Sequence, residues 1–117
     1  MLKIYGIKNC NTMKNTFAFL EEEGFVYEFL DYKKVKPDEN LLKAFLEKVA
    51  FEDLVNKRGT TYRKLAEEEK AILERPNDQA LSLLSEKNSM IKRPLIIYPN
   101  GSISLGFDEA TIKEKMG

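Results

Sequence analysis

The order of apolar patterns in the first thirty residues limits the folds open to this chain. Residues 2–6 form a short apolar run typical of a buried strand, and residues 11–20 carry apolar side chains at helical spacing. Residues 25–32 then alternate aromatic and aliphatic side chains as a second strand does. A strand, a helix and a strand within so short a segment predict two parallel strands joined by a right-handed crossover.

The rest of the chain predicts helices followed by a return to strands. Residues 38–88 repeat apolar side chains at helical spacing and contain helix-start signals, so we expect an all-helical insertion at about 38–88. Residues 95–98 and 102–105 are β-rich and flank a Pro-Asn-Gly turn, which predicts a hairpin. Asp108 is a suitable cap for a last helix.

These patterns together predict an α/β fold. Its elements follow the order β-α-β, helical insertion and β-β-α, arranged around a mixed four-stranded sheet. With 117 residues and 43% hydrophobic content, we expect one domain, residues 1–117, with a modest core.

The charge balance excludes partners that depend on bulk electrostatic attraction. Nineteen basic side chains match nineteen acidic ones, so we expect neither nucleic acid nor a membrane as a direct partner. No apolar run approaches the roughly 18–20 residues that a membrane span needs. The chain opens with strand-like sequence and without an apolar leader, and we expect a cytoplasmic protein.

Cysteine and histidine usage limits the chemistry further. One cysteine excludes an intrachain disulfide and favours a reducing compartment. The absence of histidine removes the commonest general base and metal ligand, which argues against a zinc or copper site. We therefore expect no bound metal and no bound cofactor.

The single cysteine, Cys10, falls where the first predicted helix begins. A sulfur there lies among backbone N–H groups without helical partners, at the positive end of the helix dipole. In such places the pKa of a cysteine falls from about 8.5 toward roughly 3.5–7.5, and the thiolate is the reactive form. The alternative interpretation is a small buried hydrophobic residue, which lone cysteines often are.

Two arginines stand in contexts that suit an anionic group near such a thiolate. Arg93 directly precedes Pro94 at the start of a predicted strand, and Arg58 directly precedes a predicted helix start at residues 59–61. The planar guanidinium fork can hold an oxyanion through two parallel hydrogen bonds. Surface arginines can also be merely solvated, and a proline at a strand start can be a plain edge device, so both alternatives stay open.

Three separated segments resemble the arsenate reductase-like family. They are residues 4–12 (IYGIKNCNT), residues 58–65 (RGTTYRKL) and residues 91–97 (IKRPLII), the last accompanied by Gly106-Phe107. That family includes glutathione-coupled arsenate reductases, Spx-type transcriptional regulators and a YffB-like branch, which the segments around Cys10 and Arg58 resemble most. The resemblance implies a thioredoxin-like fold with a helical insertion.

The resemblance also implies a site. Cys10 matches the reactive cysteine of the family, and Arg58 and Arg93 match two of the arginines that hold the oxyanion in the reductases. We expect the binding residues to be Arg58, Arg93, Asn11, Thr12 and Pro94.

Three positions depart from the reductase pattern. Gly106 stands near the place of a third arginine, and Gly6 and Met13 stand where the reductases have a histidine and a serine. Whether arsenate is reduced is therefore left open. Met13 also occupies the second cysteine position of the Spx-type Cys-x-x-Cys switch, so that switch cannot form here.

The predicted function is that of a thiol-dependent oxidoreductase with one reactive cysteine. A chain with a single cysteine cannot resolve its own mixed disulfide, so an outside thiol must release it. The resemblance implies glutathione or another anionic thiol as co-substrate, with glutaredoxin as a further partner. The alternative function is that of an Spx-type regulator or adaptor that binds the RNA polymerase α subunit.

Overall fold

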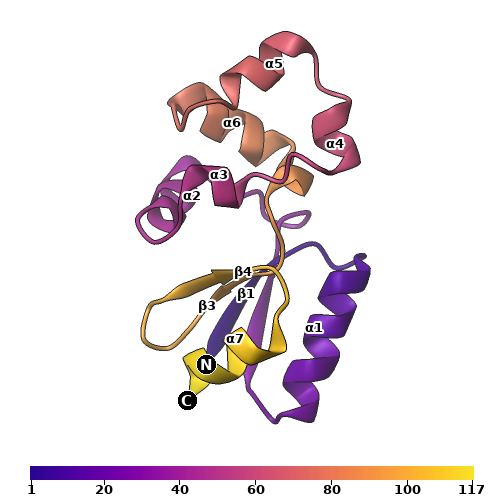
Figure 1. Cartoon of the computed structure of the whole chain (residues 1–117), viewed down its shortest axis with the longest axis vertical. Helices are drawn as coiled ribbons and strands as arrows, with labels where there is room; N and C mark the ends of the chain where they lie inside the picture. Colours follow the sequence, from indigo (N-terminus) through magenta and orange to yellow (C-terminus); the bar gives the residue numbers. More distant parts are fainter. The chain divides into compact units, whose positions relative to one another are not determined.

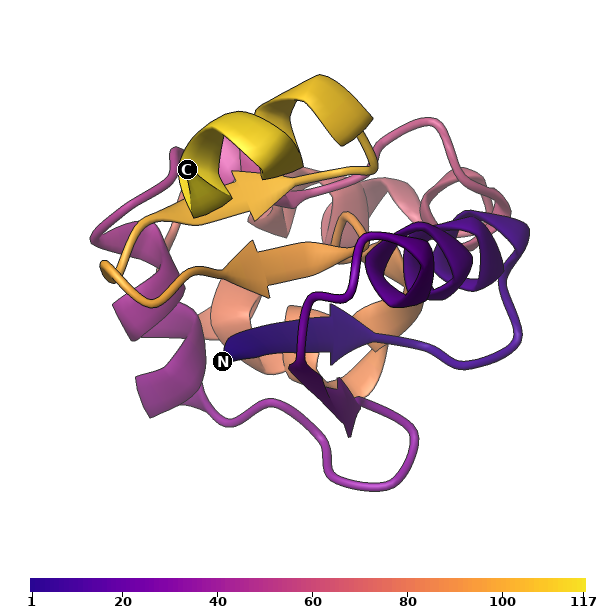
Figure 2. The same cartoon turned by 90° about the horizontal axis from the view of Figure 1, so that it is seen from below.

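The computed structural model describes residues 1–117, which form two compact units (Figures 1 and 2). The sheet unit contains residues 1–35 and 93–117, and the helical unit contains residues 36–92. Each unit buries its own set of apolar side chains. No helix in the chain combines the length and the apolar character that crossing a membrane requires.

The sheet unit is built on four strands in the order β2-β1-β3-β4. The strands are β1 (Leu2–Gly6), β2 (Tyr27–Asp31), β3 (Leu95–Ile97) and β4 (Ile103–Leu105). Helix α1 (Asn11–Glu22) joins β1 to β2, which run parallel, whereas β3 runs antiparallel to both β1 and β4 (Figure 1). The predicted mixed four-stranded sheet, crossover and hairpin are confirmed.

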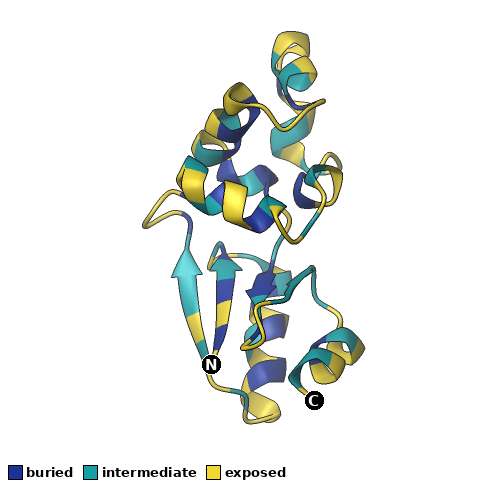
Figure 3. Ribbon diagram, turned by 90° about the vertical axis from the view of Figure 1, so that its left-hand side faces the viewer, coloured by how far each residue is buried: buried dark blue, intermediate teal, exposed yellow.

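The side chains of β1, one of the two central strands, alternate between the buried and the exposed face of the sheet. Leu2 and Ile4 are fully buried, whereas Lys3 between them is exposed (Figure 3). Ile4 pairs with Phe29 on one side and with Ile96 on the other. One apolar face of β1 is therefore covered along its whole length, which fixes the register of both neighbouring strands.

Helix α1 contributes one face to this core. Met13 and Leu20 are fully buried and Phe19 is nearly so, at the spacing that places them on one side of a helix. Thr16, also buried, satisfies its hydroxyl by donating to the Thr12 carbonyl at 2.7 Å. These buried side chains hold α1 against the sheet. Cys10 is the residue immediately before the helix.

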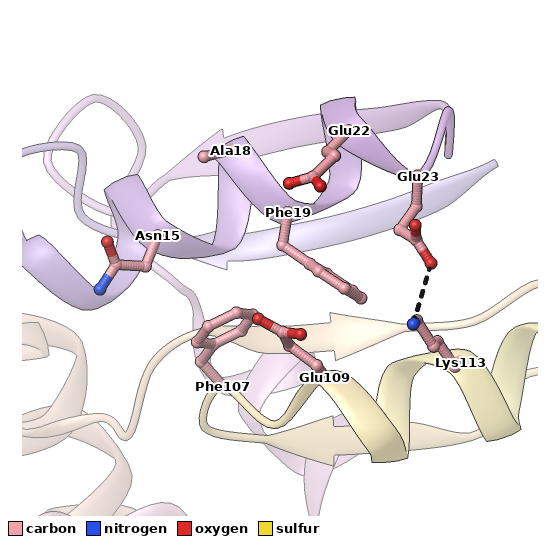
Figure 4. Close-up of a pocket in the computed structure, with 8 residues that line it drawn as sticks. All are labelled: Asn15, Ala18, Phe19, Glu22, Glu23, Phe107, Glu109 and Lys113. Atoms are coloured by element: carbon pink, nitrogen blue, oxygen red, sulfur yellow. Dashed lines mark ion pairs between the residues drawn. The ribbon is translucent and has the colours of Figure 1, made fainter.

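The sheet unit ends with helix α7 (Glu109–Met116), which Asp108 caps as predicted. Its carboxylate accepts from the Ala110 N–H at 3.1 Å. Helices α1 and α7 lie side by side, with the rings of Phe19 and Phe107 5.8 Å apart (Figure 4). The C-terminal segment thus closes over the same helix that carries the cysteine at its start.

The helical unit confirms the predicted insertion. Its helices are α2 (Glu39–Leu46), α3 (Phe51–Leu54), α4 (Thr60–Arg63), α5 (Glu67–Ile72), α6 (Asp78–Glu86) and the 3-10 turn η1 (Asn88–Met90). Its core includes the buried leucines and phenylalanine of α2 and α6, namely Leu42, Phe45, Leu81 and Leu84. A single β-bridge joins Val55, directly after α3, to Ile91, directly after η1.

Side-chain caps fix where the longer helices of this unit begin. The Asp38 carboxylate accepts from the Leu41 N–H at 2.8 Å, and the Asn77 side-chain oxygen Oδ1 accepts from the Ala80 N–H at 2.9 Å. Each bond satisfies one of the N–H groups that the first helical turn leaves without an internal partner.

Replacing Asn77 with alanine is expected to lower the free energy of unfolding by about 1 kcal/mol, because the first turn of α6 loses its cap. Urea unfolding followed by circular dichroism measures the change. Asn40→Ala is the matched control, because Asn40 is exposed within the first turn of α2 and caps no helix. Equal losses in the two variants would contradict a capping role for Asn77.

Candidate thiol site

Cys10 lies between the end of β1 and the first turn of α1. Its backbone is extended, with φ −151° and ψ 131°, and its carbonyl accepts from the Lys14 N–H at 3.0 Å. The side chain is partly exposed and packs with its other side against the core of the sheet unit. The sulfur is therefore accessible from solvent, unlike that of a fully buried structural cysteine.

Five contributions set the pKa of the Cys10 thiol. Partial burial raises the pKa, but a hydrogen bond from the Arg93 side chain and the backbone N–H groups of Met13 and Thr12 lower it, and so does the positive charge of Arg93. Neither N–H group makes a full capping hydrogen bond to the sulfur. The positive end of each N–H dipole nevertheless points toward the sulfur. The net result is a pKa below that of an ordinary cysteine.

The register of the sheet explains why Arg93 meets Cys10. Tyr5 on β1 pairs with Leu95 on β3, and the two strands are antiparallel. Continued past the strand ends, this register places Arg93 beside the loop that leads from Gly6 to Cys10. The Arg93–Pro94 peptide bond is cis, and the Pro94 carbonyl accepts from the Gly106 N–H at 2.9 Å.

Four of the other predicted site residues lie in the sheet unit with Cys10. Arg93 contacts the sulfur directly, and Thr12 contributes a backbone N–H. Asn11 is exposed at the first position of α1, and Pro94 is buried next to Arg93. The structure thus brings Cys10, Thr12 and Arg93 together, while substrate-binding roles for Asn11 and Pro94 stay predictions.

Arg58 lies in the helical unit, directly before α4. Its backbone N–H donates to the Asn56 side-chain oxygen at 3.0 Å, and its own side chain is exposed. Arg58 lines a groove of about 360 Å³ together with Glu52, Val55, Asn56, Lys57 and Lys92. Three cations against one carboxylate make this groove basic, which suits an anion, and the role of Arg58 in binding substrate stays a prediction.

A larger groove, of about 510 Å³, lies between α1 and α7 (Figure 4). It is lined by Asn15, Ala18, Phe19, Glu22, Glu23, Phe107, Glu109 and Lys113. The Lys113 ammonium lies 3.4 Å from the Glu23 carboxylate and 5.9 Å from the centre of the Phe19 ring, so the groove holds an ion pair of its own. Neither Cys10 nor Arg93 lines it, and the larger groove is therefore separate from the thiol chemistry.

Two residues that contribute to the site were not predicted as site residues. Met13 provides one of the N–H groups near the sulfur, and the missing side chain of Gly6 leaves room for the Met13 side chain next to Arg93. The residue type does not indicate where a backbone N–H points. The signals that could have found them are the glycine at the end of a buried strand and the methionine three residues after the cysteine.

Comparison with known protein families matches residues 5–115, nearly the whole chain, to the ArsC family. The chain belongs to the ArsC family. A relative of this ArsC-family protein, an uncharacterized protein of Haemophilus influenzae, is 38% identical over 109 residues, which is 93% of each chain. The family resemblance expected from the sequence is thereby confirmed.

Solved structures agree with this membership. The ArsC-family protein matches the structure of a protein named YffB over 100% of both chains, with 33% identity and a TM-score of 0.89. It also matches an arsenate reductase (ArsC) related protein from Brucella melitensis with 40% identity and a TM-score of 0.74, over 97% of this chain and 92% of the other. These matches confirm the thioredoxin-like, arsenate reductase-like fold.

Proposed function

We propose that this ArsC-family protein is a thiol-dependent oxidoreductase that uses Cys10 to reduce mixed disulfides of glutathione. The observation that carries the proposal is the contact between the Cys10 sulfur and the Arg93 side chain at the start of α1. This contact favours the thiolate, which is the nucleophile in thiol–disulfide exchange.

The first step is attack of the Cys10 thiolate on the glutathione sulfur of a mixed disulfide. A bond forms between the Cys10 sulfur and the glutathione sulfur, and the disulfide bond of the substrate breaks. The substrate sulfur leaves as a thiolate and takes a proton from solvent. Since the chain has no second cysteine, Cys10 remains as a mixed disulfide with glutathione.

The second step uses glutathione as the reductant. The thiolate of a second glutathione attacks the glutathione sulfur bound to Cys10, oxidised glutathione forms, and the Cys10 thiolate is released. A thiol with a lowered pKa is a better leaving group, so the Arg93 contact also favours this step. Over the cycle one mixed disulfide is reduced and one glutathione disulfide is produced.

Local charge supports glutathione rather than a neutral thiol. The Arg93 guanidinium is cationic and can pair with a glutathione carboxylate when Cys10 is neutral in the mixed disulfide. Arsenate is not the substrate proposed here, because Gly106 stands where a third oxyanion-holding arginine would be needed.

The proposal is tested with a glutathionylated peptide, glutathione, glutathione reductase and NADPH. We expect protein-dependent oxidation of NADPH, with a rate that rises with pH around a midpoint below the value of about 8.5 of free cysteine. The lowered pKa gives this direction, because more thiolate is present at neutral pH.

The same peptide carrying a cysteamine mixed disulfide is the matched control, because cysteamine is cationic and offers no carboxylate to Arg93. We expect a lower rate for this substrate. A rate no higher than that of glutathione alone, with either substrate, would exclude the proposed activity.

A further inference from the structure

Gly6, the buried last residue of β1, lies beside both residues that hold the sulfur of Cys10, because a side chain at this position would meet Met13 and Arg93. A Cβ atom on Gly6 would lie 2.8 Å from both Sδ and Cε of Met13, and 3.6 Å from Cβ of Arg93. The first distance is closer than real Cβ contacts come, whereas the second is ordinary van der Waals contact. The Met13 side chain therefore fills the space that a side chain at position 6 would need.

The surroundings leave this packing little freedom. The Met13 side chain is fully buried, so it cannot swing into solvent. The end of β1 is held because the Gly6 carbonyl accepts from the Tyr32 N–H at 2.9 Å. A methyl group added at Gly6 must therefore displace the Sδ and Cε end of the Met13 side chain, and because that side chain is buried, its neighbours at the start of α1 take up the displacement.

We propose that Gly6 and Met13 form a positioning pair that sets the contact between the Cys10 sulfur and the Arg93 guanidinium, an inference that rests on the function proposed above. Met13 acts at two points, because its side chain packs on Gly6 while its N–H faces the sulfur. Gly6 acts by lacking a side chain, which leaves the Met13 side chain the space that a Cβ would occupy. Neither residue reacts, and both act through Cys10 and Arg93.

The first test is Gly6→Ala, with the pKa of Cys10 measured from the rate of iodoacetamide alkylation against pH. We expect the pKa to rise by about 0.5 to 1 unit, because displacing Met13 shifts the start of α1 and weakens the hydrogen bonds that stabilise the thiolate there. A role limited to folding would lower stability without moving this pKa.

The second test is rescue by exchange of volume. Gly6→Ala combined with Met13→Val adds a methyl group at one position and removes the clashing Sδ and Cε at the other. Since volume-conserving changes are tolerated best, we expect the pKa of the double variant to return to that of the wild type. Met13→Val alone leaves Gly6 without its packing partner, and we expect it to raise the pKa as well.

Ile112→Val is the matched control. Ile112 belongs to the same buried cluster but lies on α7, so this variant is expected to lose stability in urea without a change in the Cys10 pKa. An unchanged pKa in Gly6→Ala, or a raised pKa that the double variant does not restore, overturns the proposal. If Gly6→Ala does not fold, an unchanged pKa in Met13→Val overturns it.

Alkylation needs no substrate, which separates this inference from the proposed function. A wild-type protein with no glutathione-dependent activity would refute the function and leave the pKa measurements readable. An active wild type whose Gly6→Ala variant keeps the wild-type pKa would refute only the positioning pair.

Discussion

Cys10→Ser is expected to lower the rate of glutathione-dependent reduction by at least about a thousandfold, as loss of a covalent nucleophile does in other enzymes. A serine hydroxyl has a far higher pKa than a thiol, and contact with Arg93 cannot ionise it at neutral pH. The variant also cannot form the mixed disulfide on which the second step acts. The NADPH-coupled assay with the glutathionylated peptide measures the loss.

Mass spectrometry gives an independent view of the same variant. Wild-type protein mixed with excess glutathione disulfide should gain the mass of one glutathione, and Cys10→Ser should gain none. Thr16→Ser is the matched control, because it changes a buried hydroxyl residue of α1 without touching the sulfur. Full activity in Cys10→Ser would exclude covalent catalysis by this protein.

Arg93→Met is expected to raise the pKa of Cys10 by about one unit, because the thiolate loses a charge-assisted hydrogen bond. This value is the lower end of the effect of such a loss, because the sulfur is partly exposed and solvent screens the charge. Burial, which raises the pKa, then faces only the N–H groups of Thr12 and Met13. At pH 7 the thiolate fraction, and with it the alkylation rate, should fall up to about tenfold. The rate against pH distinguishes a shifted pKa from a less accessible sulfur, which would lower the rate at every pH.

Two further variants test whether the change in the Cys10 pKa is specific to the Arg93 side chain. Arg93→Lys keeps the charge but loses the planar fork, so we expect a pKa between those of the wild type and Arg93→Met. Arg63→Met, an exposed arginine on α4 of the helical unit, is expected to leave the Cys10 pKa unchanged. If Arg93→Met kept the wild-type pKa, the helix start alone would have to account for the reactive thiol.

Much of the fold could be predicted because local chemistry and burial agree along the chain. The alternation around Ile4, the turn at Gly101 and the caps at Asp38 and Asp108 each indicate an element that the structure contains. The sequence indicated less well which face of α1 is buried. Phe17 and Phe19 both belong to the apolar pattern of residues 11–20, yet Phe19 is buried more deeply, because the segment before α7 brings the Phe107 ring against it.

The site was predictable only where residue type carries the chemistry. Cys10 and Arg93 could be proposed from their contexts, but their contact depends on the antiparallel pairing of β1 with β3, which no local pattern encodes. The N–H groups near the sulfur and the bare Cα of Gly6 are backbone features, and they become visible only in three dimensions. Arg58 lines a basic groove, and its role in binding an anion stays a prediction.

The pairing of β1 with β3 also makes the reactivity of Cys10 depend on a residue that is synthesised much later. Cys10 emerges early in synthesis, whereas Arg93 follows only after all of residues 36–92. Until β3 docks beside β1, the sulfur lacks its guanidinium partner and behaves as an ordinary, mostly protonated thiol. We therefore expect the thiolate fraction of Cys10 to rise when the last strands join the sheet, so that alkylation at neutral pH can report this step.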